Sequence, residues 1–346
     1  MLKRSLYVGI GVVLLLVLSA CNNAEPEPAE EPPKVNEQPE LQALTQQIEQ
    51  QPENPELYFN RGNIHAELGD YQAAIADFSQ AIQLDSNRNY YHVRLSDLYL
   101  LSYAPKLNLP DSKRAIDILS AYLAKFPDDQ LVLHELAETF IYVEMYDQSL
   151  ARLKQAIDAK AYNPDAYFKI GIAYKYKGDT LGAIASFRKA VEQDPELYDA
   201  HMQLGLLMSA LGNEQALAYF DNAIQIDPES QEALYGKAKF LQDLGRMDAA
   251  KRIYRGMVQQ NTQNEQALYN LGYVYLAQDS LDKAWRTFDA TVQVAPDYAA
   301  AYYARGIVNE AKGDISAAIA DFRTCLNIDP EYEAAQVALT ELAESE

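Results

Sequence analysis

Glycine, alanine and aromatic residues return in the same order about every 34 residues from residue 55 to near the C-terminal end of the chain. The clearest copy occupies residues 299–332 and carries Tyr302, Gly306, Gly313, Ala318, Phe322 and Pro330. Residues 164–197 repeat the order with Tyr167, Gly171, Gly178, Ala183, Phe187 and Pro195. Within each copy, apolar residues recur at helical spacing on both sides of a short turn that contains glycine. Each copy is therefore predicted to form a hairpin of two helices.

Small residues mark the places where the two predicted helices meet. A glycine falls inside the first helix of several copies, for example at Gly171, Gly205, Gly272 and Gly306. Glycine in a helix costs about 1 kcal/mol relative to alanine, so close approach of the second helix must offset that cost. Because a single hairpin cannot bury its apolar face alone, the copies are predicted to stack into a solenoid.

The period and these residue types resemble the tetratricopeptide repeat family. The resemblance implies an all-α, right-handed α-solenoid of eight helical hairpins, at residues 55–88, 89–129, 130–163, 164–197, 198–230, 231–264, 265–298 and 299–332. Residues 41–54 are predicted to form an N-terminal half-repeat helix, and residues 333–346 a capping helix with a polar outer face. The repeat of residues 89–129 contains an insertion at Ala104 to Leu109, which is either a functional loop or a tolerated irregularity.

The N-terminus has the pattern of a secretory leader. Lys3 and Arg4 precede an uncharged apolar run from Leu6 to Leu18, shorter than the roughly 20 residues that span a bilayer. The run ends in Leu18, Ser19, Ala20 and Cys21, which resembles the bacterial lipobox. That resemblance implies that residues 1–20 are a signal peptide and that Cys21 receives lipid and becomes the mature N-terminus. The alternative is an uncleaved anchor helix, or an ordinary signal peptide beside a chance cysteine.

Residues 21–40 are rich in glutamate and proline, so they are predicted to form a disordered tether. The whole chain carries 29 basic and 50 acidic residues, for a formal net charge of -21. This charge argues against a nucleic acid partner. The other cysteine, Cys325, takes a small-residue place of the repeat and is expected to be buried.

No catalytic constellation stands out in the chain. The sequence holds no HExxH, GxSxG, paired CxxC or phosphate-cradling glycine loop. Of the four histidines, His65, His92 and His201 take places that pack between helices, so they are expected to be structural and not ligands. The chain is therefore predicted not to be an enzyme and to need no metal ion or cofactor.

The resemblance implies that the first helices of successive hairpins line a concave groove. At groove-directed places the repeat register puts the aromatic residues Phe59, Phe168, Tyr235, Tyr269, Tyr273 and Tyr303, flanked by Glu232, Asp243 and Glu310. The same face carries ten acidic residues in all, opposed by only four basic ones, together with further tyrosines. The acidic residues are Glu56, Glu67, Asp97, Glu135, Glu138, Asp165, Asp199, Glu232, Asp243 and Glu310, the basic ones are Arg94, Lys169, Lys175 and Lys239, and the tyrosines are Tyr90, Tyr142 and Tyr176. These residues are predicted to bind a basic or neutral partner segment with apolar anchors. The alternative is that several of the rings pack on adjacent repeats.

The predicted function is that of an adaptor. The leader implies lipid anchoring to a membrane of a bacterial cell envelope. The expected membrane is the outer membrane, with the protein facing the periplasm or the surface. The groove would then bind other envelope proteins. The alternative is a surface glycan-binding or nutrient-binding lipoprotein, because aromatic rings also stack on sugars. That class usually carries long ligand-binding insertions, whereas the longest copy here, residues 89–129, exceeds the 34-residue period by only seven residues.

Overall fold

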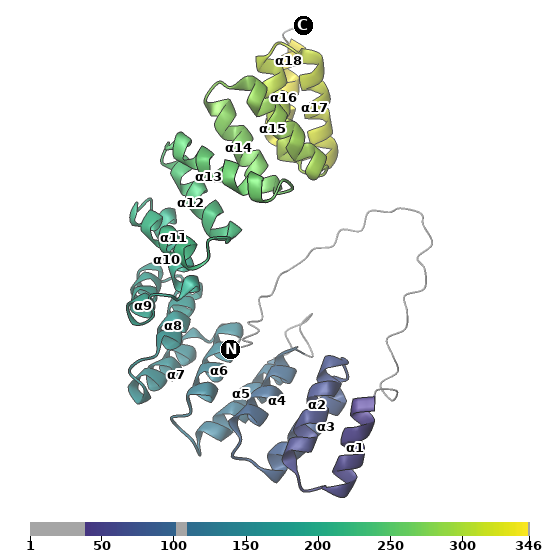
Figure 1. Ribbon diagram of the computed structural model, residues 1–346, viewed down its shortest axis with the longest axis vertical. Helices are drawn as coiled ribbons and strands as arrows, with labels where there is room; N and C mark the ends of the chain where they lie inside the picture. The colour runs from purple at the N-terminus through teal and green to yellow at the C-terminus, as the bar shows by residue number, and fades with distance from the viewer. Residues whose placement is uncertain (1–38, 102–108, 345–346) are drawn as a thin grey trace. The chain divides into compact units, whose positions relative to one another are not determined.

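The computed structural model describes residues 39–101 and 109–344, which form eighteen helices and no strand (Figure 1). They fall into two compact units that divide between Leu84 and Asp85. The predicted signal peptide, Cys21 and most of the predicted tether lie outside the described residues. Residues 104–108 of the predicted insertion also lie outside the described residues.

The first unit contains three helices: α1 (Pro39–Gln50), α2 (Pro55–Glu67) and α3 (Tyr71–Leu84). Helices α2 and α3 form a hairpin, and α1 packs against α2 with Leu41 and Ile48 buried. Helix α1 begins at Pro39, so Pro39 and Glu40 belong to a helix and not to the predicted tether.

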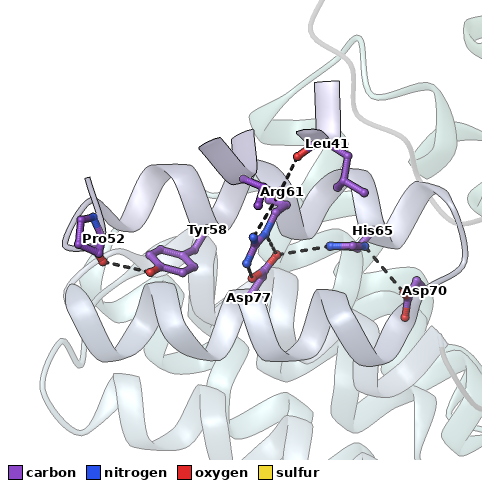
Figure 2. A network of polar contacts seen from close by, with 8 residues as sticks. Leu41, Pro52, Tyr58, Arg61, His65, Asp70 and Asp77 are labelled. Atoms are coloured by element: carbon purple, nitrogen blue, oxygen red, sulfur yellow. Dashed lines mark hydrogen bonds and ion pairs between the residues drawn. The ribbon is translucent and has the colours of Figure 1, made fainter. Parts of the chain in front are cut away.

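A polar network joins the three helices of this unit (Figure 2). The Arg61 guanidinium donates to both carboxylate oxygens of the buried Asp77, over 2.8 and 2.7 Å, and to Thr45 Oγ1 of α1 over 3.3 Å. His65 lies 3.9 Å from the carboxylates of both Asp70 and Asp77. Because a bidentate arginine fixes the geometry of its carboxylate, this contact helps to hold α2 and α3 in register.

The second unit contains seven hairpins and a final helix. Its helices are α4 (Asn89–Leu101), α5 (Leu109–Leu123), α6 (Gln130–Tyr142), α7 (Tyr146–Ala159), α8 (Pro164–Lys177), α9 (Thr180–Gln193), α10 (Tyr198–Ala210), α11 (Gln215–Ile226), α12 (Gln231–Asp243), α13 (Met247–Gln260), α14 (Glu265–Ala277), α15 (Leu281–Val294), α16 (Ala299–Ala311), α17 (Ile315–Ile328) and α18 (Glu333–Glu344).

In this unit each hairpin packs its second helix on the first helix of the next hairpin, and α17 packs on α18. First helices also contact each other, namely α4 with α6, α6 with α8, α10 with α12 and α14 with α16. We call the surface formed by these seven first helices, α4 through α16, the first-helix face. The predicted all-α repeat solenoid is confirmed.

The helix ends follow from local sequence, as the hairpin of α8 and α9 illustrates. Asn163 caps α8 by accepting from the backbone N–H of Ala166 over 3.2 Å, and Pro164 fills the first helical position. Gly178 ends α8 with a φ of 86°, a left-handed conformation that glycine adopts without strain. Asp179 then caps α9 through the N–H of Gly182.

In the hairpins that have a glycine inside the first helix, a buried ring sets the distance between the two helices. A Cβ atom on Gly171 would lie 2.5 Å from Cε1 of Phe187. The same distance would be 2.7 Å from Gly272 to Phe288 and 2.5 Å from Gly306 to Phe322. These phenylalanine side chains are fully buried. A larger residue in place of the glycine would clash with the ring, so the two helices approach to a distance that only glycine permits. The predicted close approach is confirmed.

Two glycine substitutions test this packing. Gly272→Ala should destabilise the protein by about 1 to 2 kcal/mol, because the buried Phe288 ring cannot move away from the added methyl group. Gly256→Ala in α13 is the matched control. Nothing lies within 4 Å of its added Cβ, so the better helix propensity of alanine should stabilise the protein by about 1 kcal/mol. Denaturant unfolding followed by circular dichroism measures both, and equal effects would contradict the packing argument.

Candidate functional site

The predicted aromatic series lies on the buried rings of its own hairpins. Phe168 contacts Phe187 with ring centroids 5.5 Å apart, Tyr269 contacts Phe288 at 5.8 Å, and Tyr303 contacts Phe322 at 5.6 Å. The two remaining pairs are Tyr235 with Tyr254 at 6.4 Å and, in the first unit, Phe59 with Phe78 at 5.4 Å. These first-helix rings therefore help to hold each hairpin together. Tyr269 and Tyr303 also contact Tyr298, the N-cap residue of α16, and Tyr332, just before α18, with ring centroids 5.1 and 5.2 Å apart. These two rings therefore pack toward the following helix as well as within their own hairpin, as the alternative considered from the sequence allowed.

The other predicted groove residues lie on α12, α14 and α16. Tyr273 is 45 % exposed, and Glu232 and Asp243 are exposed as well. Asp243 forms an ion pair with Lys239 one turn earlier in α12. Glu310 is half-buried. A role for these residues in partner binding stays a prediction.

A depression of about 450 Å³ opens on the first-helix face between α6 and α8. Its apolar lining includes Tyr142, Phe168, Ile172 and Tyr176. Tyr142 and Tyr176 are 41 % and 61 % exposed, although large aromatic side chains usually bury more of their surface. The two tyrosines occupy equivalent places in successive repeats, so the repeat itself forms both sides of the depression.

Charged side chains border this depression. Lys169 of α8 forms an ion pair with Glu138 of α6, and both residues contribute to the lining. Beyond Glu138 lie Glu135 of α6 and Asp97 of α4, whose carboxyl groups hydrogen-bond to each other. Arg94 Nη1 lies 3.5 Å from Asp97 Oδ2. We call Asp97, Glu135 and Glu138 the acidic cluster.

The acidic cluster holds a proton near neutral pH. Burial raises the pKa of Glu135 to about 8, and the negative charges of Asp97 and Glu138 act in the same direction. Burial also raises the pKa of Asp97, against the opposing effect of Arg94. Because the two carboxyl groups interact, the raised pKa belongs to the pair of Asp97 and Glu135.

Sequence reasoning placed these acids and tyrosines on the predicted groove but did not single them out. The available signal was the clustering of acidic residues at groove-directed places of two successive repeats, 89–129 and 130–163. Which of them meet depends on how α4, α6 and α8 pack, and the repeat period alone does not fix that packing.

The described residues, 39–101 and 109–344, contain no group of three or more side chains that could hold a metal ion. None of the helices in these residues has both the length and the apolar character needed to cross a membrane. Cys325 is buried in α17 as expected, and burial raises the pKa of its thiol to about 11.

Comparison with known proteins agrees with this architecture. The tetratricopeptide repeat family matches residues 55–88, 164–197, 213–263 and 271–343. The protein belongs to the tetratricopeptide repeat family.

Among curated proteins, the BBSome complex member BBS4 of Bos taurus is 28% identical over 144 residues, which cover 41% of this chain and 28% of BBS4. The TPR repeat-containing protein MJ1428 of Methanocaldococcus jannaschii is 26% identical over 185 residues, which cover 50% of this chain and 31% of that protein. The matches therefore span less than a third of either relative.

A similar solved structure is that of PilW, a widely conserved type IV pilus biogenesis factor. It matches with a TM-score of 0.50 and 21% identity, over 61% of this chain and 98% of PilW. At this identity the likeness concerns the fold.

The raised pKa of Glu135 predicts how stability depends on pH. The folded protein keeps a proton that the unfolded chain releases near pH 4.5, so the stability contributed by this site falls as pH rises from about 4.5 to about 8. Glu135→Gln removes the titration and should gain stability relative to the parent over that range, by an amount on the order of 2 kcal/mol. Unfolding measured at pH 5 and pH 8 checks this.

Asp97→Asn provides a second variant for the same measurement. Asp97→Asn removes a negative charge that raises the pKa of Glu135. The gain in unfolding free energy from Glu135→Gln should therefore be smaller in the Asp97→Asn background than in the parent. If the gain in unfolding free energy from Glu135→Gln in the otherwise unchanged protein is no larger at pH 8 than at pH 5, the shared proton is contradicted.

Proposed function

We propose that this protein is a lipid-anchored adaptor of a bacterial cell envelope that binds segments of partner proteins on its first-helix face. Tetratricopeptide repeats support a role as a scaffold for protein–protein interaction. The observation that carries the proposal is the open depression between α6 and α8, with Tyr142 and Tyr176 exposed at its sides. Apolar and aromatic surface in a hollow loses contact with water when a partner side chain fills it, so such a place favours binding.

The anchor is supported by the sequence. Lys3 and Arg4, the apolar run and the lipobox-like residues Leu18 to Cys21 occur in the order and spacing of a lipoprotein leader. The acidic, proline-rich residues 21–38 between Cys21 and α1 would let the repeats reach partners away from the membrane. The partners on this proposal are other envelope proteins, and the outer membrane is the proposed location.

Cys21→Ser tests the anchor. The variant should move from the membrane fraction to the soluble envelope fraction while keeping its helical content, because Cys21 is the proposed lipid acceptor and precedes the repeats in the sequence. Fractionation of bacterial cells that express the full chain, with labelled fatty acid, measures this. Fatty acid that still enters the Cys21→Ser protein would show that lipid is attached elsewhere or not through a lipobox.

Site-specific photo-cross-linking tests the adaptor role. A photoreactive amino acid in place of Tyr273, on the first-helix face, should capture envelope proteins in living cells. The same amino acid in place of Lys154, an exposed residue of the second helix α7, is the matched control and should capture several-fold less. Equal capture at the two positions would place partner binding elsewhere or remove it altogether.

A further inference from the structure

The depression between α6 and α8 combines an apolar lining with an acidic border. Phe168 rests on Phe187 of its own hairpin and Ile172 lies one turn further along α8, so this part of the lining is held in place. Tyr142 and Tyr176 keep much of their surface in water. The volume of about 450 Å³ is sufficient for one large side chain together with neighbouring backbone.

The charges beside the depression favour a cation. The acidic cluster of Asp97, Glu135 and Glu138 is opposed by Arg94 and Lys169, and the ammonium of Lys175 lies 6.0 Å from the ring centroid of Tyr176. Glu144 adds a further carboxylate to the lining. When its carboxyl groups are ionised, this region therefore has more negative than positive charge. The whole chain has the same sign, at -21.

We propose that this depression binds a partner segment in which an apolar residue enters between Tyr142 and Tyr176 and a nearby lysine or arginine contacts the acidic cluster. This inference rests on the proposed adaptor function and names the chemistry of the segment that the adaptor recognises. The apolar residue provides the contact area, while the cation selects the segment by charge.

Binding of the cation is coupled to a proton. Near neutral pH, Glu135 shares a proton with Asp97, and a lysine ammonium that approaches the pair favours its loss. The groups around Glu135 are Asp97 and Arg94 of α4, His134 and Glu138 of α6, and Asp165 and Lys169 of α8. Burial and Lys169 lower the pKa of His134, so His134 is uncharged at neutral pH. Because lysine stays charged up to about pH 10, the affinity for the segment should rise with pH until Glu135 is ionised.

Fluorescein-labelled peptides and the full chain in detergent test the proposal. One series carries a lysine and a tryptophan at varied spacing in a glycine–serine background. Two matched series replace the lysine by glutamate or the tryptophan by alanine. The lysine–tryptophan series should contain peptides that bind at least about tenfold more tightly than their counterparts, by fluorescence anisotropy. A glutamate series that binds equally well overturns the proposal.

Two exposed tyrosines localise the binding. Tyr176→Ala should weaken the best peptide about tenfold, because it removes one side of the depression without opening the core. Tyr162 is 59 % exposed before α8 and takes no part in the lining, so Tyr162→Ala should change the affinity less than about twofold. Circular dichroism should show both variants folded.

The pH profile separates charge recognition from nonspecific attraction. For the parent, affinity should rise about fivefold between pH 6 and pH 8, and Glu135→Gln should abolish the rise. A parent profile that is flat or falls over this range overturns the role of Glu135. If peptide binding depends on Tyr273 but not on Tyr176, the depression between α6 and α8 is not the binding site, and the adaptor function still stands. Failure of every peptide also overturns this site, whereas cross-linking at Tyr273 decides on the adaptor function separately.

Discussion

The close contact between a glycine of the first helix and a phenylalanine ring of the second sets the geometry of the regular hairpins. Without a Cβ at Gly171, the ring of Phe187 can lie directly on the backbone of α8. The burial of that ring contributes about 2 kcal/mol or more, which offsets the cost of a glycine inside a helix. The ring also supports Phe168, three residues before the glycine on the same face of α8. One contact therefore positions both the helix pair and part of the surface that a partner would meet.

Most of the fold could be predicted because the same residue pattern occurs in several copies along the chain. Most copies supply a glycine or alanine for the contact, a turn and a helix stop, so a departure in one copy, such as Ser96 at the contact place, does not hide the pattern. The left-handed conformation of the turn between the two helices was harder to predict where glycine is missing. Glu144 and Asp279 adopt φ values of 62° and 53°, conformations that side chains other than glycine rarely take. Nothing in those two residues alone predicts a left-handed turn.

The candidate site was predictable only in part. The aromatic series of Phe168, Tyr269 and Tyr303 has the same period as the core, so sequence spacing could not distinguish a ring that meets a partner from a ring that packs on the phenylalanine below it. The pairing of Asp97 with Glu135 was beyond prediction for another reason. It joins side chains from different repeats, and their approach depends on the packing of α4 on α6.

The support that the buried rings give to the first-helix face restricts how such a protein can diversify. A change at Tyr269 or Phe168 alters the hairpin as well as the surface, so folding selects against most replacements there. Tyr142, Tyr176 and Tyr273 have much of their side chains in water, and a replacement at these places costs the fold little. Duplicated descendants of this chain could therefore acquire new partners chiefly through those exposed positions, while the ring series keeps its residue types for reasons unrelated to recognition.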